Sequence, residues 1–161
     1  MKVVLVRVDD RLIHGQVVVG WTRTVGATRI VVADDDAAAD AMRQMLLRMA
    51  APPGVQVSIL PVEEAARQLA AGAFAGERVM VIVRSPVALV RMRELGFLFD
   101  EVNVGNVAMG PGRVRLTKEV AATPDELEAW KELDRAGVAL VARWLPGGAA
   151  GDFNRAVRAH G

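Results

Sequence analysis

Short apolar runs rich in valine and isoleucine alternate along the chain with longer segments in which apolar residues recur at helical spacing. This alternation is typical of βαβ units and predicts a mostly parallel sheet. Several runs are apolar at consecutive positions, as expected for strands that helices cover on both faces. The predicted parallel strands are Val3–Val8, Ile30–Ala33, Val55–Leu60, Val79–Val83, Val102–Val104 and Val138–Ala142.

A seventh predicted strand, Arg113–Leu116, follows the turn Gly110–Gly112. Too few residues precede it for a crossover helix, so we expect it to run antiparallel at an edge of the sheet. The pattern contains no repeat and no linker. It therefore predicts one domain over residues 1–161, an α/β three-layer open sheet of about seven strands with helices on both faces.

The helical segments carry their own start and stop signals. Met42, Met45, Leu46 and Met49 recur at the spacing of one helical face, and we expect that face to lie in the core because methionine fills irregular gaps. The same helix should end before Pro52.

Two later helices are also marked in the sequence. Thr123 offers an N-cap before Pro124, with acidic residues in the first turn that follows. A final short helix is predicted over Asp152–Ala159, after the glycine-rich segment Gly147–Gly151.

Composition excludes several classes of function. The 20 Lys and Arg residues balance 19 Asp and Glu residues, so the chain lacks the basic excess typical of nucleic-acid binding. It has no cysteine, which excludes disulfides, thiolate metal sites and a cysteine nucleophile. Charges interrupt every apolar run before it reaches the roughly 18 residues of a membrane span, and an arginine at position 7 comes too early for a secretory signal. We therefore expect a cytoplasmic protein.

The segment after the first predicted strand is the strongest candidate for a site, because ligands bind beyond the carboxyl ends of parallel strands. Its histidine, His14, can act near neutral pH as a base, a nucleophile or a phosphoryl carrier, although a lone histidine can also be structural. Arg11 lies three residues earlier, and its guanidinium suits phosphoryl oxygens. Gly15 permits close approach of the backbone.

The neighbouring pair Asp9 and Asp10 allows two interpretations. These residues could be solvated loop carboxylates that fix Arg7 or Arg11, or they could form an acidic Mg²⁺ pocket like that of a receiver domain, with Asp34 as a further oxygen ligand. A receiver domain also needs an aspartate at the end of the third strand and a lysine at the end of the fifth. The chain has neither, so this interpretation fails.

The other candidate groups are ambiguous or excluded. Asp34–Asp36 reads most simply as the acidic start of a helix, with a partner-binding rim as the alternative. Ser85, before a proline, is a helix cap or a hydroxyl facing a phosphate. No glycine-rich nucleotide motif occurs, and His160 lies next to the chain end, where fraying is expected.

The segment Val8–Val17, with the sequence VDDRLIHGQV, resembles the active-site loop of the IIB component of the mannose/fructose/sorbose family of the sugar phosphotransferase system. The resemblance covers nearly the whole chain, in the order Trp21, Met49–Val55, Arg84–Pro86, Glu101–Gly105 and Leu133–Gly137. Asn106 departs from the second glycine usual in that family.

The resemblance implies that His14 accepts a phosphoryl group at Nδ1 from the phosphohistidine of a IIA domain. His14 then passes it to a sugar held by a membrane IIC/IID pair. Arg11 would stabilise the transferred charge, because phosphoryl transfer depends on positioning and charge stabilisation. Supporting roles fall to Asp9, Asp10, Gly15, Gln16, Arg7 and Ser85, with no metal or other cofactor.

The partners implied are therefore the IIA domain, the IIC/IID complex and the sugar, without nucleic acid, and a homo-oligomer is compatible with them. Two alternatives stay open at this point. The chain could be a regulatory IIB-like module that is phosphorylated but not coupled to transport. It could also be an unrelated binding module in which His14 is structural.

Overall fold

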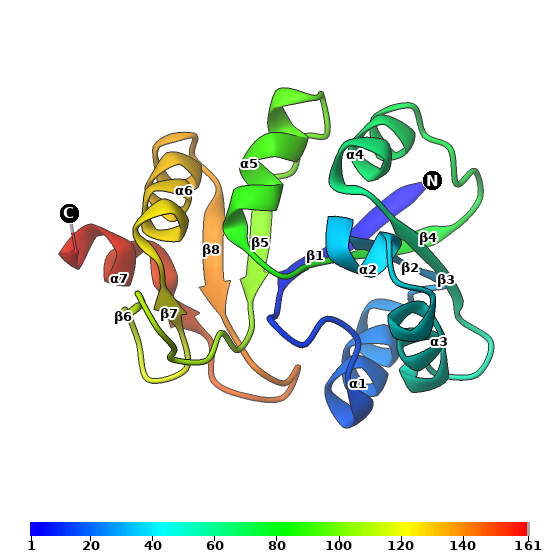
Figure 1. Ribbon diagram of the computed structural model, residues 1–161, viewed down its shortest axis with the longest axis horizontal. Helices are drawn as coiled ribbons and strands as arrows, with labels where there is room; N and C mark the ends of the chain where they lie inside the picture. Colours follow the sequence, from blue (N-terminus) through cyan, green and yellow to red (C-terminus); the bar gives the residue numbers. More distant parts are fainter. Residues whose placement is uncertain (161) are drawn as a thin grey trace.

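Six parallel strands and one antiparallel strand form the central sheet of the computed structural model, which describes residues 1–160 (Figure 1). The strand order is β3-β2-β4-β1-β5-β8-β9, and only β9 runs antiparallel to its neighbour. The strands of this sheet are β1 Lys2–Val8, β2 Arg29–Ala33, β3 Gln56–Leu60, β4 Arg78–Val83, β5 Glu101–Val104, β8 Ala139–Ala142 and β9 Gly151–Asp152.

Helices cover both faces of the sheet, which confirms the predicted three-layer α/β fold. They are α1 Gly15–Val25, α2 Asp35–Ala38, α3 Ala41–Ala50, α4 Val62–Ala70, α5 Pro86–Glu94, α6 Pro124–Arg135 and α7 Phe153–Ala159. The larger core cluster joins the sheet to α4, α5, α6 and α7, and the smaller one joins it to α1, α2 and α3. Alternate residues of the central strands enter the two clusters, because successive side chains of a strand point to opposite faces.

Several helix ends follow the signals in the sequence. Thr123 caps α6 in a reciprocal capping box with Glu126. Asp152 caps α7, and α3 ends at Ala50, before the predicted stop at Pro52. Among residues 1–160, no helix is long and apolar enough to cross a membrane.

The prediction that the methionine-rich face of α3 lies in the core is wrong. Met42 is 68% exposed and Met49 is 74% exposed, and Met45 and Leu46 are also exposed. The inward side of the helix instead carries Leu47, and Gln44, whose side chain donates hydrogen bonds to the carbonyl groups of α2. The Gln44 amide therefore binds the end of α2, and the face with the three methionines and Leu46 is exposed to solvent.

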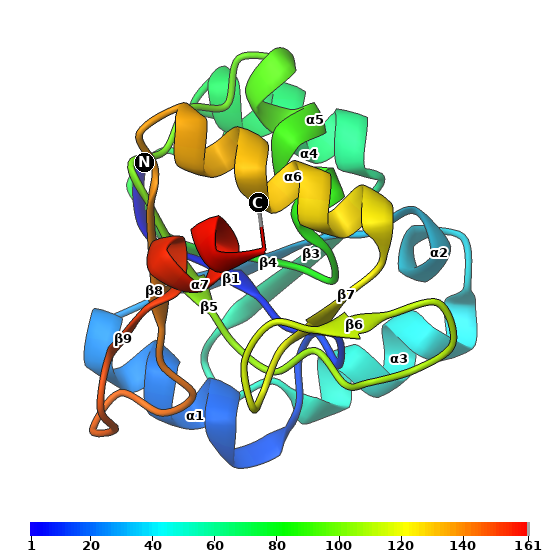
Figure 2. The ribbon, with the colours of Figure 1, turned by 90° about the vertical axis from the view of Figure 1, so that its left-hand side faces the viewer.

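The predicted antiparallel edge strand also lies elsewhere. Val114–Arg115 (β6) pairs with Ala121–Ala122 (β7) in a separate two-stranded sheet, which stands apart from β8 and β9 in Figure 2. The antiparallel edge of the main sheet is β9, beside β8. A glycine-rich segment reverses the chain between β8 and β9, and that short connection permits only antiparallel pairing.

Candidate functional site

The candidate loop leaves the carboxyl end of β1 at the centre of the sheet. From β1 the chain crosses toward β2 on one side, and from β5 it crosses toward β8 on the other, so β1 and β5 flank a topological switch point. Open α/β sheets bind their ligands at such points. Backbone hydrogen bonds fix the loop from both sides, with Asp9 N–H donating to Val83 O (3.0 Å) and Asp10 N–H donating to Asn106 O (3.0 Å).

Asp9 is the shared acceptor of this loop. Its Oδ2 accepts from Arg7 Nη2 at 3.0 Å and lies 3.1 Å from His14 Nε2, and its Oδ1 accepts from the backbone N–H of Arg11 at 3.1 Å. The side chain of Asp9 is fully buried, so the expectation of a solvated carboxylate is wrong. The buried charge is tolerated because a guanidinium and a backbone donor satisfy it.

The contact with Asp9 determines which nitrogen of His14 is available for chemistry. A carboxylate accepts but cannot donate, so the Nε2 that faces it carries the proton. The lone pair of the neutral ring is then on Nδ1. The His14 side chain is 23% exposed, which leaves it accessible to a second protein.

The backbone of the loop turns at Leu12, so that Leu12 and Ile13 are buried while Arg11 and His14 reach the surface. Leu12 has a φ of 59°, the one positive φ of a non-glycine residue within residues 1–160. Its side chain and that of Ile13 are buried in the smaller core cluster, which stabilises this uncommon conformation. Gly15 has a φ of 39°, in the left-handed region that glycine adopts without strain.

The remaining predicted residues of the loop itself fall into two groups. Arg11, Gly15 and Gln16 are exposed beside His14. Asp10 makes no hydrogen bond with His14. Its Oδ2 accepts from Ala108 N–H at 2.8 Å and so holds the segment after β5 against the loop.

Ser85 and Asp34 serve as helix caps. The Ser85 hydroxyl accepts from Val87 N–H at the start of α5, and Asp34 accepts from Ala37 N–H at the start of α2. Asp34 also pairs with Arg84 at 3.1 Å. Within the described part of the chain, no three His, Asp or Glu side chains gather in a way that could hold a metal ion.

Arg7 is buried at the centre of a polar cluster beneath the loop. Its guanidinium is 1% exposed, lies 5.6 Å from the Trp21 ring, and donates through Nη1 to Asn103 Oδ1 and to the carbonyl oxygen of Arg143. Burial lowers the pKa of Arg7, and the carboxylate of Asp9 opposes that shift.

Four residues that support this cluster were not among the predicted site residues: Asn103, Gly105, Trp21 and Arg143. Trp21 and the segment Glu101–Gly105 had entered only as parts of the family resemblance. One signal was present for two of them, since Asn103 and Gly105 stand at the end of a strand next to β1. Gly105 has no room for a side chain, because a Cβ would lie 2.5 Å from Arg7 Nη2 and 2.8 Å from Val8 O.

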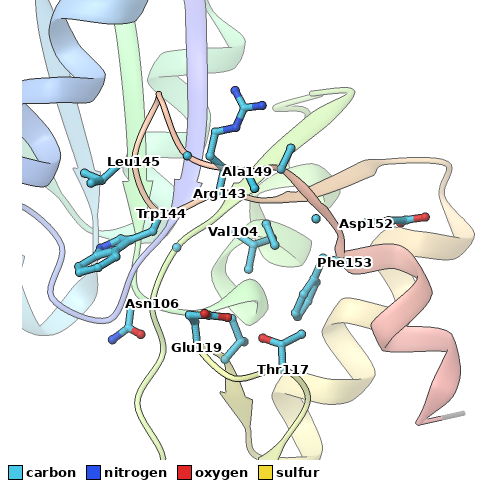
Figure 3. A pocket seen from close by; sticks show the side chains of 16 residues that line it. Val104, Asn106, Thr117, Glu119, Arg143, Trp144, Leu145, Ala149, Asp152 and Phe153 are labelled. Carbon is cyan, nitrogen blue, oxygen red and sulfur yellow. The ribbon is translucent and has the colours of Figure 1, made fainter.

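A pocket of about 430 Å³ lies beside this cluster, at the carboxyl ends of β5 and β8 (Figure 3). In this view Thr117 and Glu119 lie at one end of it, below Val104 and Phe153. His14 is not among the lining residues, but Gly105 and Arg143 are. The pocket therefore borders the site and shares Gly105 and Arg143 with the Arg7 cluster.

Together the fold and the loop define a class of protein: an open α/β sheet that presents, at its switch point, a histidine oriented by a buried carboxylate. The family model described as "PTS system sorbose subfamily IIB component" matches residues 3–161. The chain therefore belongs to this family of IIB components of the phosphotransferase system, and it is a phosphotransferase component.

Individual relatives agree with the family match. The chain is 38% identical over 140 residues to the PTS system sorbose-specific EIIB component of Klebsiella pneumoniae, covering 87% of this chain and 85% of that protein. It is 38% identical to the mannose-specific EIIAB component of Escherichia coli, covering 89% of this chain and 44% of that protein. The crystal structure of the IIBSor domain of the Klebsiella pneumoniae sorbose permease superposes with a TM-score of 0.93 at 34% identity, covering 100% of this chain and 99% of that one.

Proposed function

We propose that this protein accepts a phosphoryl group on Nδ1 of His14 from the phosphohistidine of a IIA domain. It then donates the group to a sugar held by a membrane IIC/IID complex. The observation that carries the proposal is the 3.1 Å contact between His14 Nε2 and the buried carboxylate of Asp9, because it leaves Nδ1 as the nucleophilic nitrogen.

In the first step, the bond between phosphorus and Nδ1 of His14 forms while the bond between phosphorus and the donor histidine breaks. Positive charge develops on the His14 ring as Nδ1 bonds to phosphorus, and the Asp9 carboxylate stabilises it through Nε2–H. Arg11 lies in the same loop and supplies cationic donors for the equatorial oxygens. In the second step, a sugar oxygen bonds to phosphorus while the bond between phosphorus and Nδ1 breaks. The electron pair of that bond returns to Nδ1, and the hydroxyl proton passes to solvent.

The partners of the proposal follow from the family. The similarity to a protein named as an EIIAB component supports a IIA domain as the phosphoryl donor. The IIC/IID complex, the cytoplasmic location and a homo-oligomeric state stay predictions, and so does the independence from metal, which predicts that transfer from phosphorylated IIA proceeds in EDTA.

The decisive experiment is incubation with phosphoenolpyruvate, Enzyme I, HPr and the cognate IIA domain, followed by mapping of the phosphorylated residue. We expect an acid-labile, base-stable phosphoryl group on His14 that is absent from His14→Ala and unchanged in the control His160→Ala. Phosphate on His160, or phosphate that persists in His14→Ala, would contradict the proposal. Formation of sugar phosphate in vesicles containing the IIC/IID pair then separates transport from a regulatory role.

A further inference from the structure

Asn103 is a buried amide in the interior of a parallel sheet. It lies on β5 directly opposite Arg7 of β1 in the strand register and is 4% exposed. A buried amide is unfavourable unless its polar atoms are hydrogen-bonded. Here Oδ1 accepts from Arg7 Nη1, and Nδ2 donates to the carbonyl oxygen of Arg143 at 3.1 Å.

This amide determines how the Arg7 guanidinium is oriented. Nη1 is held by two acceptors, Asn103 Oδ1 and the carbonyl oxygen of Arg143, so that only Nη2 reaches Asp9. Trp21 and Gly105 lie against the same guanidinium. Arg7 therefore binds a single oxygen of Asp9.

The single contact matters because three donors share the two oxygens of Asp9: Arg7 Nη2, the Arg11 backbone N–H and His14 Nε2. An arginine that faces a carboxylate without other acceptors commonly binds both oxygens in parallel. In that arrangement Arg7 would compete for Oδ1 with the backbone N–H of Arg11 and for Oδ2 with His14 Nε2. Asn103 Oδ1 and the Arg143 carbonyl, which the Asn103 amide also binds, together keep Nη1 occupied. Asp9 is thereby left free to hold the histidine.

We propose that Asn103 is a positioning residue for His14: it acts through Arg7 and Asp9 to keep the His14 proton on Nε2 and the lone pair on Nδ1. The inference rests on the proposed role of His14 as phosphoryl acceptor. Its primary test, however, is made on the unphosphorylated protein, so that the two can fail separately.

The test compares Asn103→Leu with wild type by two-bond ¹H–¹⁵N NMR of the neutral His14 ring, which reports the tautomer. We expect wild type to be mainly Nε2–H and Asn103→Leu to show a mixture of both tautomers. We also expect phosphoryl acceptance from IIA to slow by about tenfold or more, the size of loss seen when the hydrogen-bond partner behind a metal-ligating histidine is removed. The pH profile of acceptance should change as well.

Asn154 provides a matched control. It is an asparagine with a similar set of bonds, accepting from Leu140 N–H and donating to Asp134 and Val138, but these contacts are made at the α6–α7 side of β8. Asn154→Leu should lower stability and leave the His14 tautomer and pH profile unchanged. Where Asn103→Leu does not fold, Asn103→Thr takes its place, because threonine suits a strand and its short hydroxyl cannot bridge Arg7 and the Arg143 carbonyl.

Wild-type ring shifts and a wild-type acceptance rate in a folded Asn103 variant would overturn the proposal and make Asn103 a structural partner of Arg7 only. An altered tautomer in Asn154→Leu would also overturn it, because the effect would then follow from general loosening. If wild type shows the Nε2–H tautomer but takes no phosphoryl group, the proposed function fails and the positioning role stands.

Discussion

At the scale of single residues, the site depends on one carboxylate, that of Asp9, which has both a structural and a chemical role. Asp9 neutralises the buried charge of Arg7, which lies beneath the loop. The same carboxylate orients the accessible ring of His14. A residue in both roles links stability to chemistry, because its removal leaves one charge unpaired and one ring unoriented. Within residues 1–160, the side chain of its neighbour Asp10 has a backbone hydrogen-bond partner, Ala108 N–H, and no charged one.

We therefore expect Asp9→Asn to destabilise the protein by about 3–5 kcal/mol, because the buried Arg7 guanidinium loses its anion. Asp10→Asn keeps an acceptor for Ala108 N–H and should cost about 1 kcal/mol or less. Urea unfolding of both variants measures the difference. Equal losses in the two variants would show that the pairing of Arg7 with Asp9 does not carry the stability assigned to it.

Arg11 belongs to the same loop, but its side chain is exposed and available to a phosphoryl group. Arg11→Lys should slow donation to sugar by about 10²–10³-fold, because an ammonium lacks the forked geometry that stabilises the transferred charge. Acceptance from IIA should be less affected, since the donor brings its own stabilising groups. Rates of both half-reactions, with the exposed Arg23→Lys on α1 as control, test this; wild-type rates in both would remove Arg11 from the site.

At the scale of elements, α3 shows where an apolar pattern misleads. Its four apolar residues have the spacing of a buried face, yet the sequence does not say which neighbour the helix meets. The structure gives the inward positions to Leu47 and Gln44, because the Gln44 amide bonds the end of α2. Long-range packing of this kind cannot be read from periodicity.

The exposed face makes a direct prediction about stability. Met45→Gln should change the free energy of unfolding by no more than about 0.5 kcal/mol, as is usual for surface positions. Leu47→Ala should cost about 2–5 kcal/mol, because it empties a buried position. Urea denaturation distinguishes the two; a large loss in Met45→Gln would mean that another surface covers this face.

A second element, α7, is fastened to α6 by Asp134. This carboxylate accepts from Arg158 at 2.9 Å and 3.0 Å and from Asn154 at 2.8 Å, and these hydrogen bonds, that of Arg158 foremost, lower the pKa of Asp134. A lowered pKa in the folded state means that the carboxylate stabilises the fold above its unfolded pKa, and that this stabilisation disappears as the pH falls through the folded value.

Asp134→Asn should therefore cost about 1 kcal/mol at pH 7, a modest figure because Arg158 is largely exposed. The difference from wild type should shrink as the pH falls below about 4. Thermal unfolding across this range checks it, with Glu128→Gln, from an exposed pair with Arg135, as control. A difference that stays constant down to pH 2 would exclude the ionic contribution.

At the scale of the whole molecule, the parallel sheet and the loop that carries His14 could be predicted from the sequence. The strand order and the contacts beneath the loop could not. Consecutive apolar residues over Val79–Val83 mark a strand that is covered on both faces, and the loop that ends in His14 follows a similar apolar strand. The contacts of Arg7 with Asn103 and the Arg143 carbonyl join positions 96 and 136 residues apart, and only the fold brings them together. Local patterns thus locate the site, while its supporting contacts depend on tertiary structure.

The same long-range contacts bear on whether residues 1–161 form one domain. The sheet separates two core clusters, with Trp21 buried in the smaller one and Trp130 in the larger one. Both clusters take side chains from the same central strands, so neither can lose its packing without exposing the other. We therefore expect one cooperative unfolding transition.

Fluorine-labelled tryptophan distinguishes the two clusters in a single sample, because Trp21 and Trp130 give separate NMR signals. The resonances of both should lose native intensity at the same urea concentration, while the exposed Trp144 serves as the reference for a solvated ring. Trp21 also donates to the Trp144 carbonyl at 2.8 Å, which joins α1 to the segment after β8 across the site. If the Trp21 signal changed well before that of Trp130, the face that carries α1 and the His14 loop would be a separate folding unit, and the site would be lost before the larger core.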